Sequence, residues 1–171
     1  MLSATSGVGS VSDPCILGHM GGSLSFERAT PEDVTTIGSL VRKAYAPYVS
    51  RIGREPAPMA ADYATAVANS RVLLARSGAD LLGVLVTEPH DGYLLIENIA
   101  VDPSAQGAGV GRALLGRAER EARSLGIPEL RLYTNAKMTE NLAYYPRRGF
   151  REVDRRREDG FDRVYFARAV D

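Results

Sequence analysis

A glycine-rich turn between an apolar run and an amphipathic helix constrains this chain more than any other feature. Residues 106–111 read Gln-Gly-Ala-Gly-Val-Gly and follow the apolar run of residues 93–101. Glycine lets a backbone approach a ligand closely, because no Cβ stands in the way. The start of the following helix offers unpaired N–H groups and the positive end of the helix dipole, and both favour an anion. The turn therefore predicts a site for a nucleotide pyrophosphate, and a plain helix start with flexible glycines is the alternative.

The spacing of the glycines excludes two other nucleotide-binding turns. A dinucleotide-binding fingerprint needs glycine at its first, third and sixth positions, but Arg112 occupies the sixth position counted from Gly107. A P-loop ends in Gly-Lys followed by Ser or Thr, and the two lysines of the chain, Lys43 and Lys137, are far from the turn. The pattern that remains is Gln-x-x-Gly-x-Gly.

Composition indicates one domain in a reducing compartment, which we expect to be the cytoplasm. The 171 residues include 21 basic and 21 acidic side chains, so no global field attracts nucleic acid or a membrane. The single cysteine, Cys15, excludes an internal disulfide, and the histidines His19 and His90 are far apart, so we expect no metal site. No apolar run approaches the roughly 18 residues that a membrane-spanning helix needs.

Residues 1–23 differ in kind from the rest of the chain. They are rich in Gly and Ser, lack periodicity and carry one charge, Asp13. No basic start precedes an apolar core, so the segment is not a secretory signal. We expect a disordered leader, either native or the remnant of an expression tag, followed by a single domain over residues 24–171.

Hydrophobic periodicity predicts an α/β fold in which a central mixed, mostly antiparallel sheet of about seven strands carries helices on both faces. Helices are expected from Pro31 to about Ala44, over 60–69, over 109–125, and from Thr139 to a point before Gly149. Prolines and Gly53 predict a loop or short turns over residues 47–58, and Pro146 predicts a kinked or unwinding last helical turn. The expected strands are residues 24–28, 71–76, 81–87, 93–101, 129–134, 150–153 and 163–169.

This order of elements, with the glycine-rich turn after the fourth strand, resembles the GNAT N-acetyltransferase superfamily over about residues 24–169. Three segments carry the resemblance: residues 97–113, the tripeptide Tyr-Thr-Asn at 133–135, and Asn-Leu-Ala-Tyr-Tyr-Pro-Arg-Arg-Gly-Phe at 141–150. The resemblance implies the GNAT fold and acetyl-CoA (coenzyme A) as cofactor. It also implies direct acetyl transfer to the primary amine of a small molecule or peptide, and it is compatible with a homodimer.

The resemblance also implies which residues contact coenzyme A. Main-chain N–H groups of the turn would hold the pyrophosphate, and the backbone of the fourth strand would pair with the pantetheine arm. Asn135 and Asn141 compete for one further contact, because the family's asparagine is displaced in this chain. The other residues implied are Ile99, Ala100, Val101, Gln106, Gly107, Gly109, Val110, Gly111, Arg112, Ala113 and Tyr144.

Two residues match the catalytic positions of the family. Glu97 stands where members commonly keep a glutamate that deprotonates the amine, and the alternative is a carboxylate paired with an arginine at the sheet surface. The two-residue period of a strand places Glu97, Ile99 and Val101 on one face. Tyr145 matches the tyrosine that protonates the leaving thiolate. Tyr144 is its rival, because a helix separates the two by about 100° and only one is expected to point at the cofactor.

The segment between Tyr45 and Tyr63 is expected to determine the acceptor. Its two arginines hint at a carboxylate-bearing amine, although they also suit surface positions beside Glu55 and Asp62. A non-catalytic acyl-CoA-binding or sensing module on the same fold is the alternative to an enzyme. The candidate acceptor residues are Tyr48, Arg51, Arg54, Met59 and Tyr63.

Overall fold

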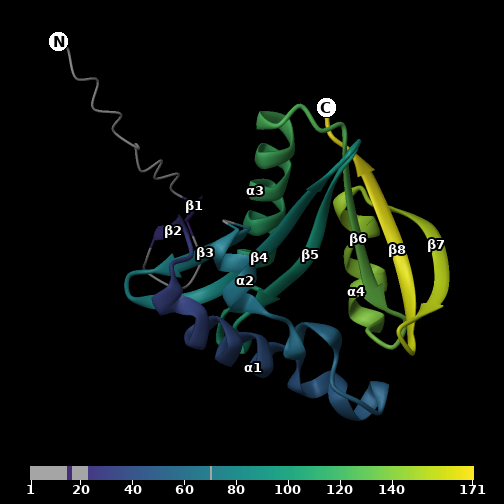
Figure 1. Ribbon diagram of the computed structural model, residues 1–171, viewed down its shortest axis with the longest axis horizontal. Helices are drawn as coiled ribbons and strands as arrows, with labels where there is room; N and C mark the ends of the chain where they lie inside the picture. The colour runs from purple at the N-terminus through teal and green to yellow at the C-terminus, as the bar shows by residue number, and fades with distance from the viewer. Residues whose placement is uncertain (1–14, 17–22, 70) are drawn as a thin grey trace.

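The computed structural model describes residues 15–16, 23–69 and 71–171, and a single large sheet dominates it (Figure 1). The strands are β1 Cys15–Ile16, β2 Ser23–Arg28, β3 Val72–Ser77, β4 Asp80–His90, β5 Tyr93–Val101, β6 Glu129–Asn135, β7 Arg151–Glu158 and β8 Phe161–Ala169. The α-helices are α1 Val34–Ile52, α2 Tyr63–Ala68, α3 Val110–Ser124 and α4 Thr139–Tyr144. Short 3₁₀ turns are η1 Pro31–Asp33, η2 Ala57–Ala60, η3 Pro103–Ala105 and η4 Pro146–Arg148.

The sheet runs in the order β1-β2-β3-β4-β5-β6-β8-β7, and only the β5–β6 pair is parallel. The predicted α/β fold with a mixed, mostly antiparallel sheet is confirmed. The two-residue strand β1 adds an eighth strand to the seven that were expected, and it pairs with the start of β2. The rest of the leader predicted over residues 1–23 lies outside the described residues, except Ser23, which begins β2.

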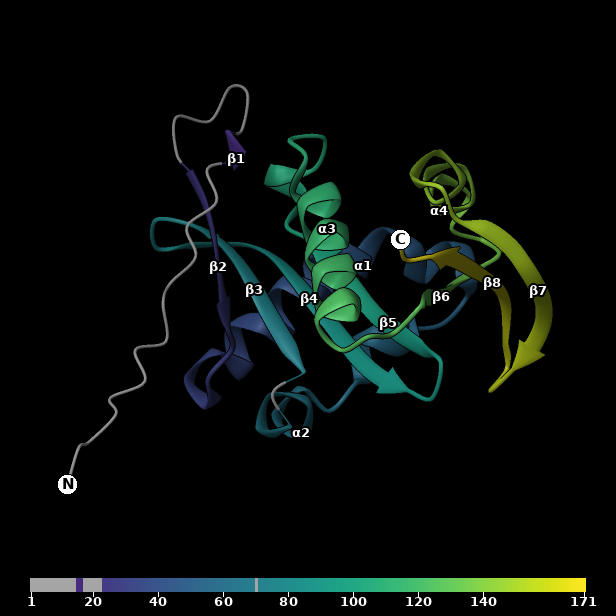
Figure 2. The same cartoon turned by 90° about the horizontal axis from the view of Figure 1, so that it is seen from above.

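Helices cover both faces of the sheet, as predicted. In Figure 2, α3 and α4 lie on one side of the strands, and α1 and α2 lie on the other. The core on the first side joins Leu114 and Ala118 of α3 to strand residues such as Leu94 and Phe166. The core on the second side joins Ile37 and Val41 of α1 to α2, β3 and β4. Burial of these two apolar surfaces is the main stabilising contribution to the fold.

The expectation of a loop starting at Pro47 is wrong, because α1 continues through this proline to Ile52. Proline removes one backbone hydrogen bond from a helix, but contacts beyond it hold the last turns. Arg51 near the helix end forms an ion pair with Glu140 of α4 at 2.7 Å. The helix ends at Gly53, which takes the left-handed conformation at φ 82° and donates its N–H to the Val49 carbonyl.

The second and last helices also differ in length from the sequence pattern. α2 begins at Tyr63, after Asp62 accepts a hydrogen bond from the Thr65 N–H at 3.0 Å, so the residues before it form the separate turn η2. The predicted disturbance at Pro146 is confirmed, because α4 ends at Tyr144 and η4 follows from Pro146.

Two irregularities in β5, a bulge and a short pairing with β6, determine the shape of the candidate site. Val86 pairs with Asn98 and Thr87 with Ile96, so Glu97 is the extra residue of a β-bulge. The parallel ladder between β5 and β6 covers only residues 94–96 of β5. Beyond it, no strand in the described parts of the chain pairs with residues 97–101 on their β6 side, and β5 and β6 visibly diverge (Figure 1).

Helix α3 packs directly on β4 at Gly83. A Cβ at this buried position would lie 2.9 Å from both Leu114 Cδ1 and Val110 Cγ1. We therefore expect Gly83→Val to lower the free energy of unfolding by about 1–3 kcal/mol through overpacking, measured by thermal or urea denaturation. Gly116→Ala on the same helix has open space around it and should be neutral or stabilising by up to about 1 kcal/mol. Equal stability of the two variants would contradict this close approach.

Candidate active site

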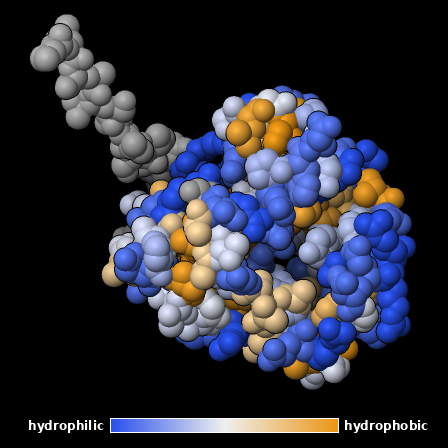
Figure 3. Space-filling view, viewed as in Figure 1, coloured by the Kyte–Doolittle hydropathy of each residue, from blue (hydrophilic) through white to orange (hydrophobic). Residues whose placement is uncertain are grey.

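Two hollows adjoin beside the divergent part of β5. The inner cavity has a volume of about 380 Å³ and lies between the η2–α2 segment and strands β5, β6 and β8. The glycine cleft has a volume of about 650 Å³ and lies between α1, the end of β5, the glycine-rich turn and α4. Tyr45 of α1 lines both hollows. In the space-filling view, a recess opens near the middle of the face toward the viewer (Figure 3).

The glycine-rich turn forms one wall of the cleft with its backbone. Gly107 and Gly109 adopt positive φ angles of 81° and 91°, which other residues rarely tolerate. The first helical bond of α3 runs from the Ala113 N–H to the Gly109 carbonyl at 3.0 Å. The N–H groups of the three preceding residues therefore remain available to a ligand. The residues of this segment that line the cleft are Gln106, Gly107, Gly109, Val110, Gly111 and Arg112.

Ala113 is a correction to the predicted set of donors. Its N–H is already bonded within the helix, and it does not line the cleft. The physical reason is the helix start: with Gly109 as the N-cap, the fourth residue after it is the first that can donate to a carbonyl one turn back. The set of N–H donors predicted from the sequence was therefore one residue too long.

The opposite wall of the cleft comes from α4 and η4. A Cβ at Gly111 would lie 3.4 Å from the Tyr144 hydroxyl, so the cleft is narrow at this point. Arg148 also lines the cleft, with its guanidinium 5.1 Å from the centre of the Tyr144 ring. Its Nε is buried and has no hydrogen-bond partner among the described residues. Sequence reasoning missed Arg148, although its place four residues after Tyr144 in a short helical segment was a usable signal.

Residues Ile99, Ala100 and Val101 of β5 line the glycine cleft. Their strand lacks a partner on the β6 side over this stretch of the described chain. An extended ligand can therefore bond to this edge as an additional strand would. The same geometry leaves main-chain N–H groups free to face a developing negative charge.

Glu97 lies on a different face from the one that was predicted. It lines the inner cavity together with its neighbour Asn98, whereas Ile99 and Val101 pack against the core beneath α3. The bulge at Glu97 is the reason, because an extra residue interrupts the alternation of side chains along a strand. Glu97 Oε2 accepts a hydrogen bond from Arg71 Nη1 at 3.0 Å, so the ion pair considered as the alternative is present.

A buried polar network connects α1, α2 and β5 at the wall between the hollows. The Tyr45 hydroxyl donates to Asn98 Oδ1 at 2.7 Å, and Asn98 Nδ2 donates to the Tyr63 hydroxyl at 3.0 Å. Tyr63 in turn donates to the Pro58 carbonyl at 2.7 Å. Burial raises the pKa of Tyr63 to about 12 and raises the pKa of Tyr45 well above its ordinary value. Asn98 and Tyr45 were missed, although an asparagine inside an apolar strand was a visible signal.

Tyr144, the last residue of α4, and Tyr145, which follows it, both line the glycine cleft. Which of the two points at the cofactor stays a prediction. Tyr144 reaches toward Gly111, and Tyr145 packs against the rings of Phe150 and Phe166 at 5.8 and 5.7 Å. Burial, and then the neighbouring Tyr144 and Tyr48, raise the pKa of Tyr145 above its ordinary value.

The structure separates the two asparagines that competed for a cofactor contact. Asn141 lines the glycine cleft, where its Nδ2 donates to Thr134 Oγ1 at 3.0 Å. Asn135 lines the inner cavity, and its side chain accepts a hydrogen bond from the Lys137 N–H at 2.9 Å. Of the two, Asn141 is the one that shares a cleft with the glycine-rich turn, because β6 has diverged from β5 before Asn135. Which of them meets the cofactor stays a prediction.

The candidate acceptor residues are distributed over three places. Tyr63 lines the inner cavity, while Tyr48 and Arg51 line the glycine cleft. Met59 lines neither hollow.

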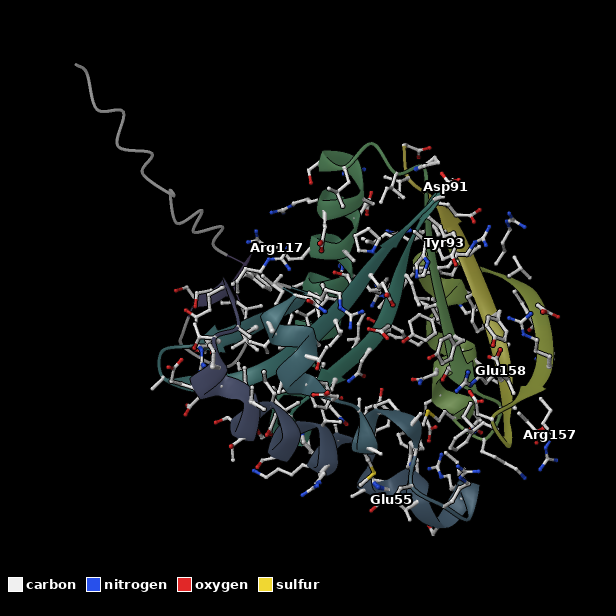
Figure 4. All side chains as sticks on the ribbon, in the orientation of Figure 1. Glu55, Asp91, Tyr93, Arg117, Arg157 and Glu158 are labelled. Carbon is white, nitrogen blue, oxygen red and sulfur yellow. The ribbon has the colours of Figure 1, made fainter. Side chains whose placement is uncertain are left out.

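Arg54 lies outside both hollows, with its guanidinium 4.0 Å from the centre of the Phe161 ring and its Nη1 donating to the Asp159 carbonyl at 3.4 Å. This contact ties the segment after α1 to the β7–β8 turn, and Figure 4 shows Glu158 at the end of β7 above the segment that carries Glu55. The arginines that line the inner cavity are instead Arg71 and Arg163.

Within residues 15–16, 23–69 and 71–171, no group of three or more His, Cys, Asp or Glu side chains is arranged to hold a metal ion. No helix of this part of the chain combines the length and the apolar character needed to cross a membrane.

The polar network predicts a specific sensitivity at Tyr63. Tyr63→Phe removes one hydroxyl and leaves the Asn98 amide and the Pro58 carbonyl without their partners. We expect the free energy of unfolding to fall by about 1–3 kcal/mol, measured by urea denaturation. Tyr48→Phe is the matched control, because Tyr48 is only half-buried, and it should change the stability by less than about 0.5 kcal/mol. An unchanged free energy of unfolding in Tyr63→Phe would show that the network does not stabilise the fold.

Comparison with known proteins places this geometry in one family. The model of the Acetyltransferase (GNAT) family matches residues 37–150, which is more than half of the chain. By structure, the PaiA N-acetyltransferase of Thermoplasma acidophilum, solved in complex with coenzyme A, superposes with a TM-score of 0.72. The two share 18% identity, and the superposition covers 86% of this chain and 99% of that one, so this likeness concerns the fold.

Two curated relatives match in sequence over part of their length. An IAA acetyltransferase of Azospirillum brasilense is 34% identical over 82 residues, which are 47% of this chain and 54% of that protein. A mycothiol acetyltransferase of Jonesia denitrificans is 39% identical over 71 residues, which are 42% of this chain and 23% of that protein. The matches therefore span about half of the first relative and about a quarter of the second. Taken with the family model, these matches show that the chain belongs to the GNAT acetyltransferase family.

Proposed function

We propose that this protein is an acetyl-CoA-dependent N-acetyltransferase that moves an acetyl group directly to a primary amine. The observation that carries the proposal is the meeting of two hollows where β5 diverges from β6. A thioester that follows the free edge of β5 through the glycine cleft would end beside the inner cavity, where an amine can reach it. The Thermoplasma protein of the same fold was solved with coenzyme A, which supports the assignment of the cleft.

Coenzyme A fits the chemistry of the glycine cleft. The available N–H groups of Val110, Gly111 and Arg112 would donate hydrogen bonds to the pyrophosphate oxygens. Each such contact at the helix start would contribute about 0.3–1 kcal/mol to binding. Several such contacts must act together, and the cations Arg112 and Arg148 line the same cleft. The β5 backbone at residues 99–101 would pair with the pantetheine arm, and Asn141 and Tyr144 would contact it from α4.

The acceptor amine must lose a proton before it can attack. A lysine-like amine with a pKa of about 10.4 is neutral in about one molecule of 2,500 at pH 7, which is equivalent to about 4.6 kcal/mol. Glu97 is the carboxylate on β5 that lines the inner cavity next to the start of the divergent edge. We assign it as the base, oriented by its hydrogen bond to Arg71.

Acetyl-CoA supplies an activated acyl group whose carbonyl oxygen gains negative charge during transfer. The main-chain N–H of Ile99 or a neighbour, at the free edge of β5, would donate to that oxygen. The leaving sulfur needs a proton, and the phenol of Tyr145, which lines the cleft and is protonated at neutral pH as any ordinary phenol is, would donate it. The single cysteine, Cys15, belongs to β1, with three strands between it and β5. Transfer without a covalent enzyme intermediate agrees with that placement.

A non-catalytic acyl-CoA-binding module is the second candidate function. The observation that favours it is the Arg71–Glu97 ion pair, because the hydrogen bond from Arg71 already occupies an oxygen of the carboxylate that would accept the proton of the amine. This candidate predicts that acetyl-CoA binds and that no amine is acetylated. Turnover of any amine in an assay of free thiol release decides between the two.

Removal of the Tyr145 hydroxyl is the most direct test of the chemistry. We expect Tyr145→Phe to lower kcat by about 100-fold or more, because the leaving thiolate loses its proton donor. The affinity for acetyl-CoA, measured by calorimetry, should stay near that of the wild type. Tyr144→Phe is the matched control on the same turn. If Tyr145→Phe kept the full kcat and Tyr144→Phe lowered it, Tyr144 rather than Tyr145 would be the proton donor.

The cleft itself can be closed without backbone strain at Gly111, whose φ is not positive. A leucine side chain there would fill the narrow space against the Tyr144 hydroxyl. We expect Gly111→Leu to weaken the binding of acetyl-CoA by about tenfold or more, or at least about 1.4 kcal/mol, measured by calorimetry. Gly116→Ala, one and a half turns further along α3, should bind as the wild type does. Unchanged affinity in Gly111→Leu would contradict the assignment of the cleft.

A further inference from the structure

The basic side chains that line the inner cavity are already offset by carboxylates of the protein. Among the described residues these side chains are Arg71 and Arg163. Nη1 of Arg71 contacts two carboxylates, Glu97 at 3.0 Å and Glu88 at 3.1 Å. The positive charge of this guanidinium is therefore shared between two negative neighbours, and a third carboxylate from a ligand would approach like charges.

Arg163 is in the same situation on the opposite side of the cavity. Its Nη1 contacts Glu158, at the end of β7 (Figure 4), at 2.7 Å. Its Nη2 contacts Asp159 at 3.5 Å. Neither guanidinium of the cavity wall thus carries a surplus of positive charge that could hold an acidic group.

The arginines whose sequence positions hinted at a carboxylate-bearing amine do not change this balance. Arg51 lines the glycine cleft instead of the inner cavity, and Glu140 contacts it there at 2.7 Å. Arg54 lies outside both hollows and donates to the Asp159 carbonyl. The hint from the sequence therefore finds no support in the wall of the inner cavity.

Two carboxylates also line the inner cavity, and one of them keeps an oxygen for a ligand. Both oxygens of Asp62 accept hydrogen bonds from Thr65, from its N–H at 3.0 Å and from its hydroxyl at 2.7 Å, so this carboxylate has no cation as its partner there. Glu97 is bonded through Oε2 to Arg71, while its Oε1, which is not buried, accepts no hydrogen bond from the described residues. The wall therefore carries an excess of negative charge and offers one carboxylate oxygen to a single ammonium group.

The rest of the wall favours an apolar ligand body. The hydroxyls of Tyr45 and Tyr63 are bonded within the Asn98 network, so these two residues offer mainly their rings. Such surfaces suit an apolar or aromatic group, and a volume of about 380 Å³ is near the lower end for small-molecule sites. Other apolar side chains that line the cavity are Ile52, Val86, Met138 and Phe161.

We propose that the acceptor is a primary monoamine with a compact apolar or aromatic body and no acidic group, whose ammonium binds Oε1 of Glu97. This inference rests on the proposed function. The ammonium gives one proton to Glu97, and the nitrogen then bonds to the acetyl carbon as the carbon–sulfur bond breaks. Tyr145 protonates the sulfur and regains a proton from the nitrogen, so the products are an N-substituted acetamide and the free thiol of coenzyme A.

Acceptors that differ in a single group test the exclusion of acids. Wild-type protein and acetyl-CoA are incubated with phenethylamine, L-phenylalanine or L-phenylalaninol, while free thiol is measured. L-phenylalaninol carries a hydroxymethyl group in place of the carboxylate, so it separates the effect of charge from that of size. We expect kcat/KM for L-phenylalaninol and for phenethylamine to exceed that for L-phenylalanine by at least about tenfold.

A diamine tests the assignment to monoamines. A second ammonium group would have to enter the apolar part of the cavity, where the other carboxylate of the wall, Asp62, already accepts hydrogen bonds at both oxygens. We expect kcat/KM for phenethylamine to exceed that for 1,4-diaminobutane by at least about tenfold. A preference for the diamine would overturn this assignment.

Glu88→Gln tests whether the paired carboxylates cause the exclusion. It removes one of the two charges that offset Arg71, and Glu88 does not line the cavity. The ratio of kcat/KM for L-phenylalaninol to that for L-phenylalanine should fall by about threefold. Glu152→Gln is the matched control, because this residue pairs with Arg155 on the exposed strand β7 and lines neither hollow, and it should leave the ratio unchanged. An equal ratio in both variants would overturn the electrostatic argument.

Direct binding keeps the proposal testable where thermal denaturation shows that a variant is not folded. Calorimetry on the wild-type protein with bound coenzyme A should show tighter binding of phenethylamine than of L-phenylalanine. Equal turnover of L-phenylalanine and L-phenylalaninol, or acetylation of other amines but of neither L-phenylalaninol nor phenethylamine, would overturn this inference and leave the proposed function standing. Binding of acetyl-CoA with no acetylation of any amine would overturn both.

Discussion

The divergence of β5 from β6 is the constraint on which the rest of this site depends. The two strands pair over only three residues, and a bulge at Glu97 begins where the pairing ends. A sheet that stayed closed would bond the backbone of residues 97–101 internally and leave no edge for a ligand. Because it opens, the N–H groups of β5 face a cleft, and two hollows can adjoin in the middle of a sheet that is otherwise continuous.

An open sheet needs other contacts to hold its shape. On one side, the Asn98 network connects β5 to Tyr45 of α1 and Tyr63 of α2. On the other side, Arg51 and Glu140 join α1 to α4 across the glycine cleft. The buried hydrogen bonds of the Asn98 network are costly to break, because each lost partner leaves a desolvated group, whereas the exposed Arg51–Glu140 pair contributes little to stability. The same contacts that define the hollows therefore also keep them open.

Electrostatics divides the two hollows between two kinds of ligand group. The glycine cleft presents a helix start together with Arg112 and Arg148, which suits a phosphorylated carrier. The inner cavity presents the Arg71–Glu97 pair among aromatic walls. Tyr45, which lines both hollows, and Tyr145, which lines the glycine cleft, have pKa values that burial raises above the ordinary value of a phenol.

The sequence by itself determined the order of elements, the helices on both faces and the glycine-rich helix start. These features depend on local rules: a periodicity, a cap, or a backbone angle that only glycine tolerates readily. The place of residues 99–101 beside the cleft was implied by the resemblance to the family. The sequence misplaced Glu97 on the face of Ile99, extended the donors to Ala113, and broke α1 at Pro47. Only the tertiary structure decided that Asn141 and both α4 tyrosines share one cleft, and that Arg71 rather than Arg54 reaches the inner cavity. Those outcomes depend on a bulge and on contacts between residues far apart in sequence, whose energies no local pattern contains.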